Sequence, residues 1–172
     1  MTDRGFDPVA HARAVRAGGF WLDKTFDEFL TATIAATPDK LAIIADRADR
    51  DQPRRLTYSE FGDFIARAAA SLRNMGAGHG DVVAVQLPNW WEFAVIALAC
   101  GRIGAVVNPL MPIFRERELG YMLDFAEAKV LVTPKMFRGF DHEAMAEGLR
   151  AGLPKLKHVI VVGGEGENAF DK

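Results

Sequence analysis

Few residues in this 172-residue chain combine the types and spacing that catalysis requires. The single cysteine, Cys100, would need a nearby base to act as a nucleophile, but it lies inside the apolar run FAVIALAC. This setting favours a small core residue, and a lone cysteine excludes an internal disulfide. No histidine shows metal-ligand spacing with carboxylates or with the cysteine: His11, His79, His142 and His158. The residues alone therefore predict neither a metal site nor a nucleophile, base and oxyanion site.

Two glycine-rich stretches have the composition of phosphate-binding loops but stand in the wrong context. GAGHGD at 76–81 follows a predicted helix and precedes a strand, whereas a dinucleotide-binding loop needs the opposite order. VVGGEGEN at 161–168 follows a strand but lacks the Lys-Ser/Thr ending. We interpret the first stretch as a turn and the second as a flexible tail.

Other polar and aromatic residues receive structural interpretations. Asp81 and Glu92 have no evident partner, so cap or surface roles are expected. Trp90 and Trp91 flank a helix start, which favours packing at a domain interface over base stacking. A run of arginines interleaved with aspartates is interpreted as a solvated loop that contains Arg47, Arg50, Arg54 and Arg55.

Composition excludes several classes of protein. Apolar residues make up 49% and charged residues 26%, as in ordinary globular domains, and the length suits one domain. A net charge of −2 and a pI near 6.1 predict no nucleic-acid partner. The longest apolar stretch, 93–110, contains an arginine, glycines and a proline, so no membrane span is expected. Because the N-terminus lacks a signal-peptide pattern and the one cysteine fits a reducing compartment, we expect a cytoplasmic protein.

Hydrophobic periodicity predicts an arm, an α/β unit and a tail. Residues 1–24 lack periodicity and are expected to form an arm that is packed on the surface or partly disordered. Helices are expected from Thr25 to Pro38 and over 57–75, 90–103, 115–128 and 141–153. Thr25 with Glu28 and Thr57 with Glu60 match the capping-box pattern at helix starts, and Asn89 with Glu92 suggests a third start. Strands are expected over 41–46, within 54–61, and over 81–87, 105–109, 129–133 and 158–162. The α/β unit covers 25–163 and the tail 164–172.

Strands and helices alternate, and the strands are short, continuous apolar runs. This pattern predicts the α/β class, with a mainly parallel sheet and helices on both faces. Ligands bind such sheets outside the carboxyl ends of the strands. The segment NPLMPIF at 108–114 lies at such an end, and its prolines stop the strand and stiffen the loop. Spacing alone favours a plain connector, with a ligand-channel wall as the alternative.

Three stretches between Leu56 and Thr133 resemble the N-terminal part of the AMP-forming adenylating enzymes, which include acyl-CoA synthetases, luciferases and peptide-synthetase adenylation domains. They are LTYSEF, GAGHGDVVAVQLPNWWEFAVIALACGRIGAVVNPL and RERELGYMLDFAEAKVLVT. The similarity covers about residues 20–163. Within the family, NPLMPIFRERELGYML is most similar to cyclohexanecarboxylate–CoA ligases and medium-chain acid–CoA ligases.

The resemblance implies an enzyme that activates a small carboxylic acid with ATP and Mg²⁺ and transfers it to coenzyme A. The family supplies its triphosphate-binding residues from a Ser/Thr/Gly-rich loop that ends in Pro-Lys, from later acidic motifs and from a lysine in a C-terminal domain. None of these motifs occurs in the 172 residues. The chain is therefore expected to be the N-terminal part of a longer ligase, to contain no catalytic residues, and to be inactive alone.

Residues matching the coenzyme A channel of the family can be carried over to this sequence. Met111, Pro112 and Ile113 match a segment that lies along the channel, mainly through its backbone. Arg138, with Lys135 as second choice, matches a basic residue that contacts the nucleotide end of coenzyme A. Gly120 replaces the polar residue usual in its helix, which predicts close packing against a neighbour.

Two other functions remain open at this level. The chain could be a naturally short binding or interaction module, or a small nucleotide-binding oxidoreductase, although the second lacks a strand, glycine-rich turn and helix in that order. A piece of a larger ligase would expose an apolar face, so self-association is also expected.

Overall fold

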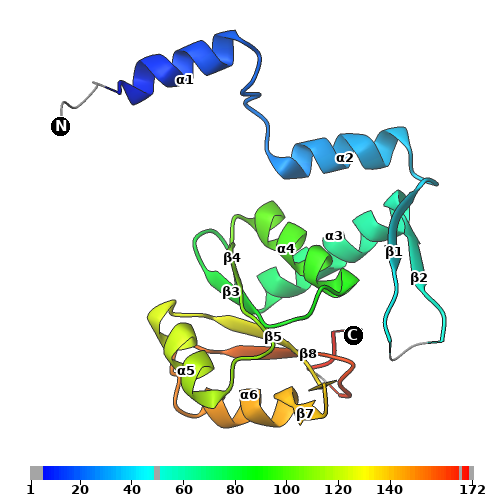
Figure 1. Cartoon of the computed structure of the whole chain (residues 1–172), viewed down its shortest axis with the longest axis vertical. Coiled ribbons are helices and arrows are strands. Elements are labelled where there is room, and N and C mark those ends of the chain that lie inside the picture. Colours follow the sequence, from blue (N-terminus) through cyan, green and yellow to red (C-terminus); the bar gives the residue numbers. More distant parts are fainter. Residues whose placement is uncertain (1–5, 49–50, 167, 171–172) are drawn as a thin grey trace.

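The computed structural model describes residues 6–48, 51–166 and 168–170. Its centre is a parallel four-stranded sheet in the order β4-β3-β5-β8 (Figure 1). The strands are β3 (Val82–Val85), β4 (Val106–Pro109), β5 (Val130–Pro134) and β8 (His158–Val162). Helices α3 (Tyr58–Asn74) and α4 (Trp91–Ile103) cover one face, and α5 (Glu116–Phe125) and α6 (His142–Arg150) cover the other. The predicted α/β class is confirmed.

Apolar runs form these strands because both faces of the sheet are covered. Side chains alternate along β3 and β5, so that Val83 and Val130 join the core with α3 and α4, whereas Ala84 and Leu131 join the core with α5 and α6. Each of these four side chains is completely buried. The two cores lock the strand register, since a shift of one residue would exchange the faces.

Local signals start most of the helices where the sequence predicts them. The capping boxes of Thr25 with Glu28 and Thr57 with Glu60 both form. α6 begins after Asp141, whose carboxylate accepts a hydrogen bond from the Ala144 N–H. α4, however, begins one residue later than Asn89 suggests, with Trp90 as its N-cap and no side-chain cap.

Gly120 allows α5 and α6 to approach closely, as predicted. A Cβ atom at this position would lie 3.3 Å from Cδ2 of Leu149 on α6. The cost of glycine within a helix is thus offset by the contact between two helices on the same face of the sheet.

Two antiparallel hairpins flank the sheet. β1 (Leu41–Ala45) pairs with β2 (Arg54–Thr57), both of which the sequence predicts. β6 (Met136–Phe137) pairs with β7 (Phe140–Asp141) between β5 and α6. The second hairpin was not predicted, because strands of two residues are too short to show a period of two.

The N-terminal arm contains a helix that the sequence analysis missed. α1 (Pro8–Ala17) follows Asp7, whose side chain accepts hydrogen bonds from two N–H groups of the first turn, and Pro8 occupies the first helical position. Asp7 and Pro8 are therefore the signal that could have revealed it. Every residue of α1 is exposed or half-buried, and the helix stands apart from the sheet (Figure 1), rather than packing on the surface as one alternative proposed.

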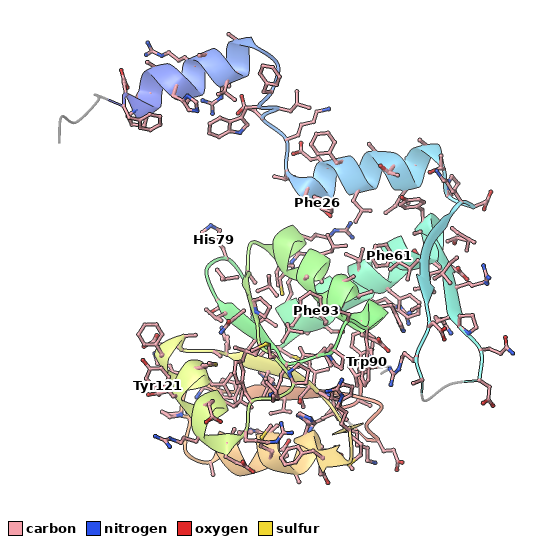
Figure 2. All side chains as sticks on the ribbon, viewed as in Figure 1. Phe26, Phe61, His79, Trp90, Phe93 and Tyr121 are labelled. Carbon is pink, nitrogen blue, oxygen red and sulfur yellow. The ribbon has the colours of Figure 1, made fainter. Side chains whose placement is uncertain are left out.

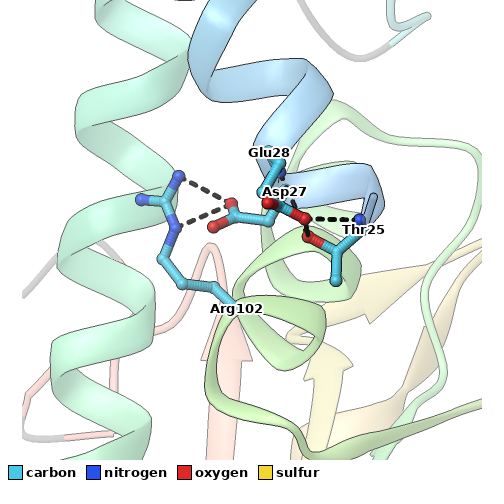
Figure 3. Close-up of polar contacts among 4 residues, drawn as sticks. All are labelled: Thr25, Asp27, Glu28 and Arg102. Atoms are coloured by element: carbon cyan, nitrogen blue, oxygen red, sulfur yellow. Dashed lines mark hydrogen bonds and ion pairs between the residues drawn. The ribbon is translucent and has the colours of Figure 1, made fainter. Parts of the chain in front are cut away.

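α2 (Phe26–Ala36) connects the arm to the body of the molecule. Leu30 is the one buried residue of α2. The helix also forms an ion pair with α4. Both Nε and Nη2 of Arg102 donate to Oδ1 of Asp27, at 2.9 and 2.8 Å, beside the Thr25–Glu28 capping box (Figure 3). The start of α2 is thus held by one charged contact as well as by Leu30.

The predicted tail folds back in its described part. Phe170 packs against Trp91 with ring centroids 5.9 Å apart, and Ala169 bridges Val161 of β8. Residues 167, 171 and 172 of that prediction lie outside the described residues. Across the described ranges, no helix is both long and apolar enough to cross a membrane.

Candidate functional site: a groove at the carboxyl edge of the sheet

The strand order creates a crevice at one edge of the sheet. β3 comes first in the chain but lies between β4 and β5, so the connections after β3 and β4 leave on opposite faces of the sheet. The loops that follow these strands therefore diverge and leave a gap at their carboxyl ends. This is the position at which doubly wound sheets bind ligands.

A groove of about 540 Å³ occupies that position. All four predicted site residues line it: Met111, Pro112 and Ile113 from the loop after β4, and Arg138 from the turn between β6 and β7. Met111 is 58% and Ile113 72% exposed, so the wall is apolar and open. The volume lies within the range of small-molecule sites.

The β6–β7 hairpin presents Arg138 at the groove. Arg138 and Gly139 form its two-residue turn, with φ values of 50° and 75°. Positive φ at both positions is what a hairpin turn of this length requires, and glycine adopts it without strain. The Arg138 guanidinium lies 5.3 Å from the Phe137 ring centroid. Lys135, the second choice, instead pairs with Glu165 at 3.7 Å.

The loop wall is fastened by side chains that sequence reasoning missed. Gln86, fully buried just after β3, donates from its amide nitrogen to the carbonyls of Met111 at 3.2 Å and Phe114 at 3.1 Å. Arg115 donates through Nη1 to the carbonyls of Pro112 at 2.8 Å and Phe114 at 3.0 Å. The loop is thus held by long-range contacts as well as by its prolines.

His142 lies beneath the groove and joins its two sides. It is completely buried, and its Nδ1 is 3.4 Å from Oε1 of Gln86. Its ring also packs against Phe137 and Phe140 of the β6–β7 hairpin, with centroids 6.4 and 5.0 Å away. Burial lowers the pKa of His142, and the positive charge of Arg115 lowers it further. The neutral ring, with Nδ1–H donating to Gln86, fits these surroundings.

A second groove of about 560 Å³ adjoins the first, and the two share Phe137 and Arg138 among their lining residues. Arg47 lines its far side, where its guanidinium lies 3.3 Å from the Trp90 ring centroid. Arg47 also pairs with Glu92 at 3.5 Å, and their side chains are 9% and 3% exposed. In Figure 2, Trp90 lies on the side of the sheet nearer the β1–β2 hairpin, and Tyr121 lies on the other side.

These contacts correct two predictions. Arg47 does not belong to a solvated loop, because its charge is buried against an aromatic ring and a carboxylate. Glu92 has no surface role because its side chain is buried beside Arg47, and α4 has no side-chain cap. Asp81, for which the sequence showed no partner, accepts a hydrogen bond from the Gly78 N–H and pairs with Lys129 at 3.0 Å. The predicted Arg50 lies outside the described residues.

Cys100 is confirmed as a core residue. Its side chain is completely buried in α4, and burial raises the pKa of its thiol to about 12. Within residues 6–48, 51–166 and 168–170, no three His, Cys, Asp or Glu side chains are placed to hold a metal ion. The groove is lined by an apolar loop and a cation, and the loop rests on the buried amide of Gln86.

Comparison with known proteins shows the family to which the chain belongs. The sequence pattern of the AMP-binding enzymes matches residues 30–171. The chain belongs to the AMP-binding enzyme family. This match confirms the predicted family.

Several relatives in the AMP-binding family are adenylate-forming ligases. The salicyl-AMP ligase / salicyl-S-ArCP synthetase of Mycobacterium tuberculosis is 40% identical over 159 residues, which are 92% of this chain and 28% of that protein. The medium-chain fatty-acid–CoA ligase of Escherichia coli is 34% identical over 149 residues, covering 87% and 25%. The apo structure of MbtA from Mycobacterium smegmatis superposes with a TM-score of 0.74 at 36% identity, covering 92% and 28%. The chain thus spans between a quarter and a third of these relatives.

Proposed function

We propose that this chain is the N-terminal portion of an ATP-dependent acid–thiol ligase that uses coenzyme A. In the first step, a carboxylate oxygen attacks the α-phosphorus of ATP, and pyrophosphate leaves as the acyl-adenylate forms. In the second step, the thiol sulfur attacks the acyl carbon, the bond to AMP breaks, and a thioester is produced. Membership of the AMP-binding family supports the first step.

The groove at the carboxyl edge of the sheet is the observation that carries the second step. Two segments more than twenty residues apart meet there, one apolar and one cationic. The N–H groups of Met111 and Ile113 have no hydrogen-bond partner among the described residues. They are free to bind the amide oxygens of a pantetheine arm, which suits the predicted backbone contacts.

Arg138 suits the other end of coenzyme A. Its exposed guanidinium stands at the junction of the two grooves, where a phosphate can reach it. Arginine binds phosphate through charge-assisted hydrogen bonds. The residues present therefore fit the thiol substrate, with Met111, Pro112 and Ile113 along the arm and Arg138 at the nucleotide end.

The chemistry of ATP requires groups that these residues do not provide. Phosphoryl chemistry needs donors and Mg²⁺ around the triphosphate, and the family supplies them from motifs that the 172 residues do not contain. We therefore propose that the 172-residue chain is inactive by itself. We further propose a cytoplasmic location, as expected for an enzyme that consumes ATP and coenzyme A.

The acid is proposed to be alicyclic or medium-chain, from the similarity of residues 108–123 to ligases of such acids. The comparisons include a salicyl-AMP ligase as well as a medium-chain fatty-acid–CoA ligase, so the family alone allows both ring and chain acids. A useful panel contains cyclohexanecarboxylate, octanoate and salicylate, each offered at equal concentration.

The test uses the polypeptide of the complete reading frame beside the 172-residue chain. With ATP, Mg²⁺, coenzyme A and the acid panel, the longer polypeptide should release AMP and form a thioester, whereas the chain should form none. Failure to form an adenylate with any acid would contradict the ligase proposal. Thioester formation by the 172-residue chain alone would contradict its inactivity.

Arg138 provides a sharper test of coenzyme A binding. Arg138→Gln should raise the KM for coenzyme A roughly tenfold, which corresponds to about 1.4 kcal/mol, and leave the KM for ATP unchanged. Arg117→Gln, an exposed arginine on α5, is the matched control and should change neither. Pantetheine lacks the nucleotide end, so the variant and the parent protein should use it equally well. An equal loss with pantetheine would refute the assigned role.

A further inference from the structure

Both walls of the groove rest on one buried polar cluster. Gln86 lies at its centre: the amide nitrogen holds two carbonyls of the loop after β4, and the amide oxygen faces Nδ1 of His142. His142 in turn contacts the hairpin that carries Arg138. The sequence separations, 25 residues from Gln86 to Met111 and 56 from Gln86 to His142, show that the cluster joins segments that are distant along the chain.

Arg115 closes the same cluster from the side of α5. Its Nη1 holds the carbonyls of Pro112 and Phe114, and its guanidinium lies 4.0 Å from the ring centroid of Phe140 on β7. Three of the four carbonyls between 111 and 114 are therefore occupied by side-chain donors. The Pro112 carbonyl shares a rigid peptide plane with the Ile113 N–H, so the contact with Arg115 also fixes the direction of that N–H.

The cluster is costly to keep, which argues for a role beyond filling space. Nε2 of the buried His142 has no hydrogen-bond partner among the described residues. A buried polar atom without a partner has lost its hydrogen bonds to water and gained none in return, which destabilises the folded state. An apolar residue at this position would avoid that cost but would lose the link to Gln86. Buried polar networks fix one arrangement of the chain where apolar packing would allow several.

We propose that Gln86 is a positioning residue for the thiol substrate: it fixes the loop 111–114 and, through His142, keeps that loop in register with Arg138. This inference rests on the proposed function, since it needs the groove to receive the thiol. Gln86 does not touch the substrate. It sets the distance between the apolar wall and the cation, so that the two ends of a long, flexible ligand meet their partners together.

The test separates the two half-reactions in the polypeptide of the complete reading frame. Gln86→Met keeps the length of the side chain but removes both donors. It should raise the KM for coenzyme A tenfold or more, while acid-dependent exchange of pyrophosphate into ATP stays within twofold. Arg115→Gln, on a half-buried residue that a folded chain tolerates more easily, should act in the same direction. Arg115→Lys keeps a charged donor and should restore part of the affinity.

Thr133→Val is the matched control. Thr133 is completely buried on the neighbouring strand β5, and its hydroxyl has no hydrogen-bond partner within the described part of the chain. The variant therefore removes a buried polar atom at similar depth without releasing the loop. Both half-reactions should stay within twofold of the parent protein.

Amide hydrogen exchange provides a second measurement that does not depend on turnover. Gln86→Met should accelerate exchange at residues 111–115 and 138–142 together, and Thr133→Val should not. An unchanged KM for coenzyme A, an equal loss in both half-reactions, or faster exchange of the loop without the hairpin would each overturn the inference. If the parent protein forms the adenylate but no thioester, the proposed use of coenzyme A fails instead, and the exchange experiment still decides whether Gln86 couples the two segments.

Discussion

The loop 111–114 and the described part of the N-terminal arm, residues 6–24, both expose large apolar side chains, but their backbones are held differently. In the loop, Ile113 is 72% exposed, while the carbonyls around it are bound by Gln86 and Arg115. In the arm, Phe20 is 87% exposed, and the contacts around it are local, such as the ion pair of Arg16 with Asp23.

This difference separates two uses of an exposed apolar side chain. A wall that is fixed from within can receive a ligand without losing conformational freedom on binding, and this preorganisation favours affinity. A segment held by local contacts opens easily and offers its apolar surface to another protein surface. The same degree of exposure therefore predicts a ligand site in the loop and a docking surface in the arm.

The largest expected contrast is in stability. Leu119→Ala, at a completely buried position on α5 beneath the loop, should lower the free energy of unfolding by about 2–5 kcal/mol. Phe20→Ala in the arm should change it by no more than about 0.5 kcal/mol. Urea unfolding measures both values. Equal effects would show that the arm is packed as tightly as the body.

The next contrast concerns self-association of the 172-residue chain, which the exposed apolar surface predicts. The double substitution Phe20→Ser and Trp21→Ser should weaken association roughly tenfold, about 1.4 kcal/mol. The matched pair Met111→Ser and Ile113→Ser should leave it unchanged, since the loop belongs to the groove. Light scattering over a concentration series distinguishes the two. A strictly monomeric parent chain would contradict the prediction.

A smaller contrast is expected in the response to pH. The pKa of His142 is lowered by burial and by Arg115, and Asp141 opposes this effect. In the unfolded chain the histidine has its ordinary pKa, near 6.5, and above that pH the neutral ring contributes its full stability to the folded state. This contribution is lost as the pH falls through the lower pKa of the folded state, because the unfolded chain binds the proton more readily. After correction for the intrinsic exchange rate, amide exchange at 111–115 should therefore become faster as the pH falls from 7 to 5, and by more than exchange in α1.

His142→Asn is the variant that checks this assignment. Asparagine has no titrating group and keeps an N–H donor close to the position of Nδ1. The acceleration of loop exchange at low pH, after correction for the intrinsic exchange rate, should disappear in the variant. If it persists, another group is responsible.

The smallest effect is expected where the arm joins the body. Asp27→Asn removes the charge of the pair with Arg102, whose partners are 31% and 22% exposed. The expected loss is about 0.5–1 kcal/mol and should decrease with salt. Glu147→Gln, which weakens an exposed pair with Arg150 on α6, is the control and should change stability less. Thermal unfolding at two salt concentrations measures both. A salt-independent loss would show that packing of α2 matters more than charge.

Local patterns in the sequence account for most of the elements. Capping boxes at Thr25 and Thr57 act over three residues, and apolar runs mark strands covered on both faces, so neither depends on distant contacts. The alternation of strands and helices predicts the parallel sheet and places residues 111–113 at its carboxyl edge. Gly120 within a helix predicts a close contact with a neighbouring element. Arg138 was predicted as a site residue only from the family resemblance, because nothing in its local sequence indicates a ligand.

The tertiary structure decided what lies next to what. Arg47 looked solvated until the fold brought Glu92 and Trp90 to it, and Gln86 looked like one polar residue at a strand end until Met111 and His142 met it. The physical reason is that propensity and capping act within one turn or one strand. Burial, and hence the pKa of His142 and the fixing of the loop, arises only when segments distant in sequence exclude water together.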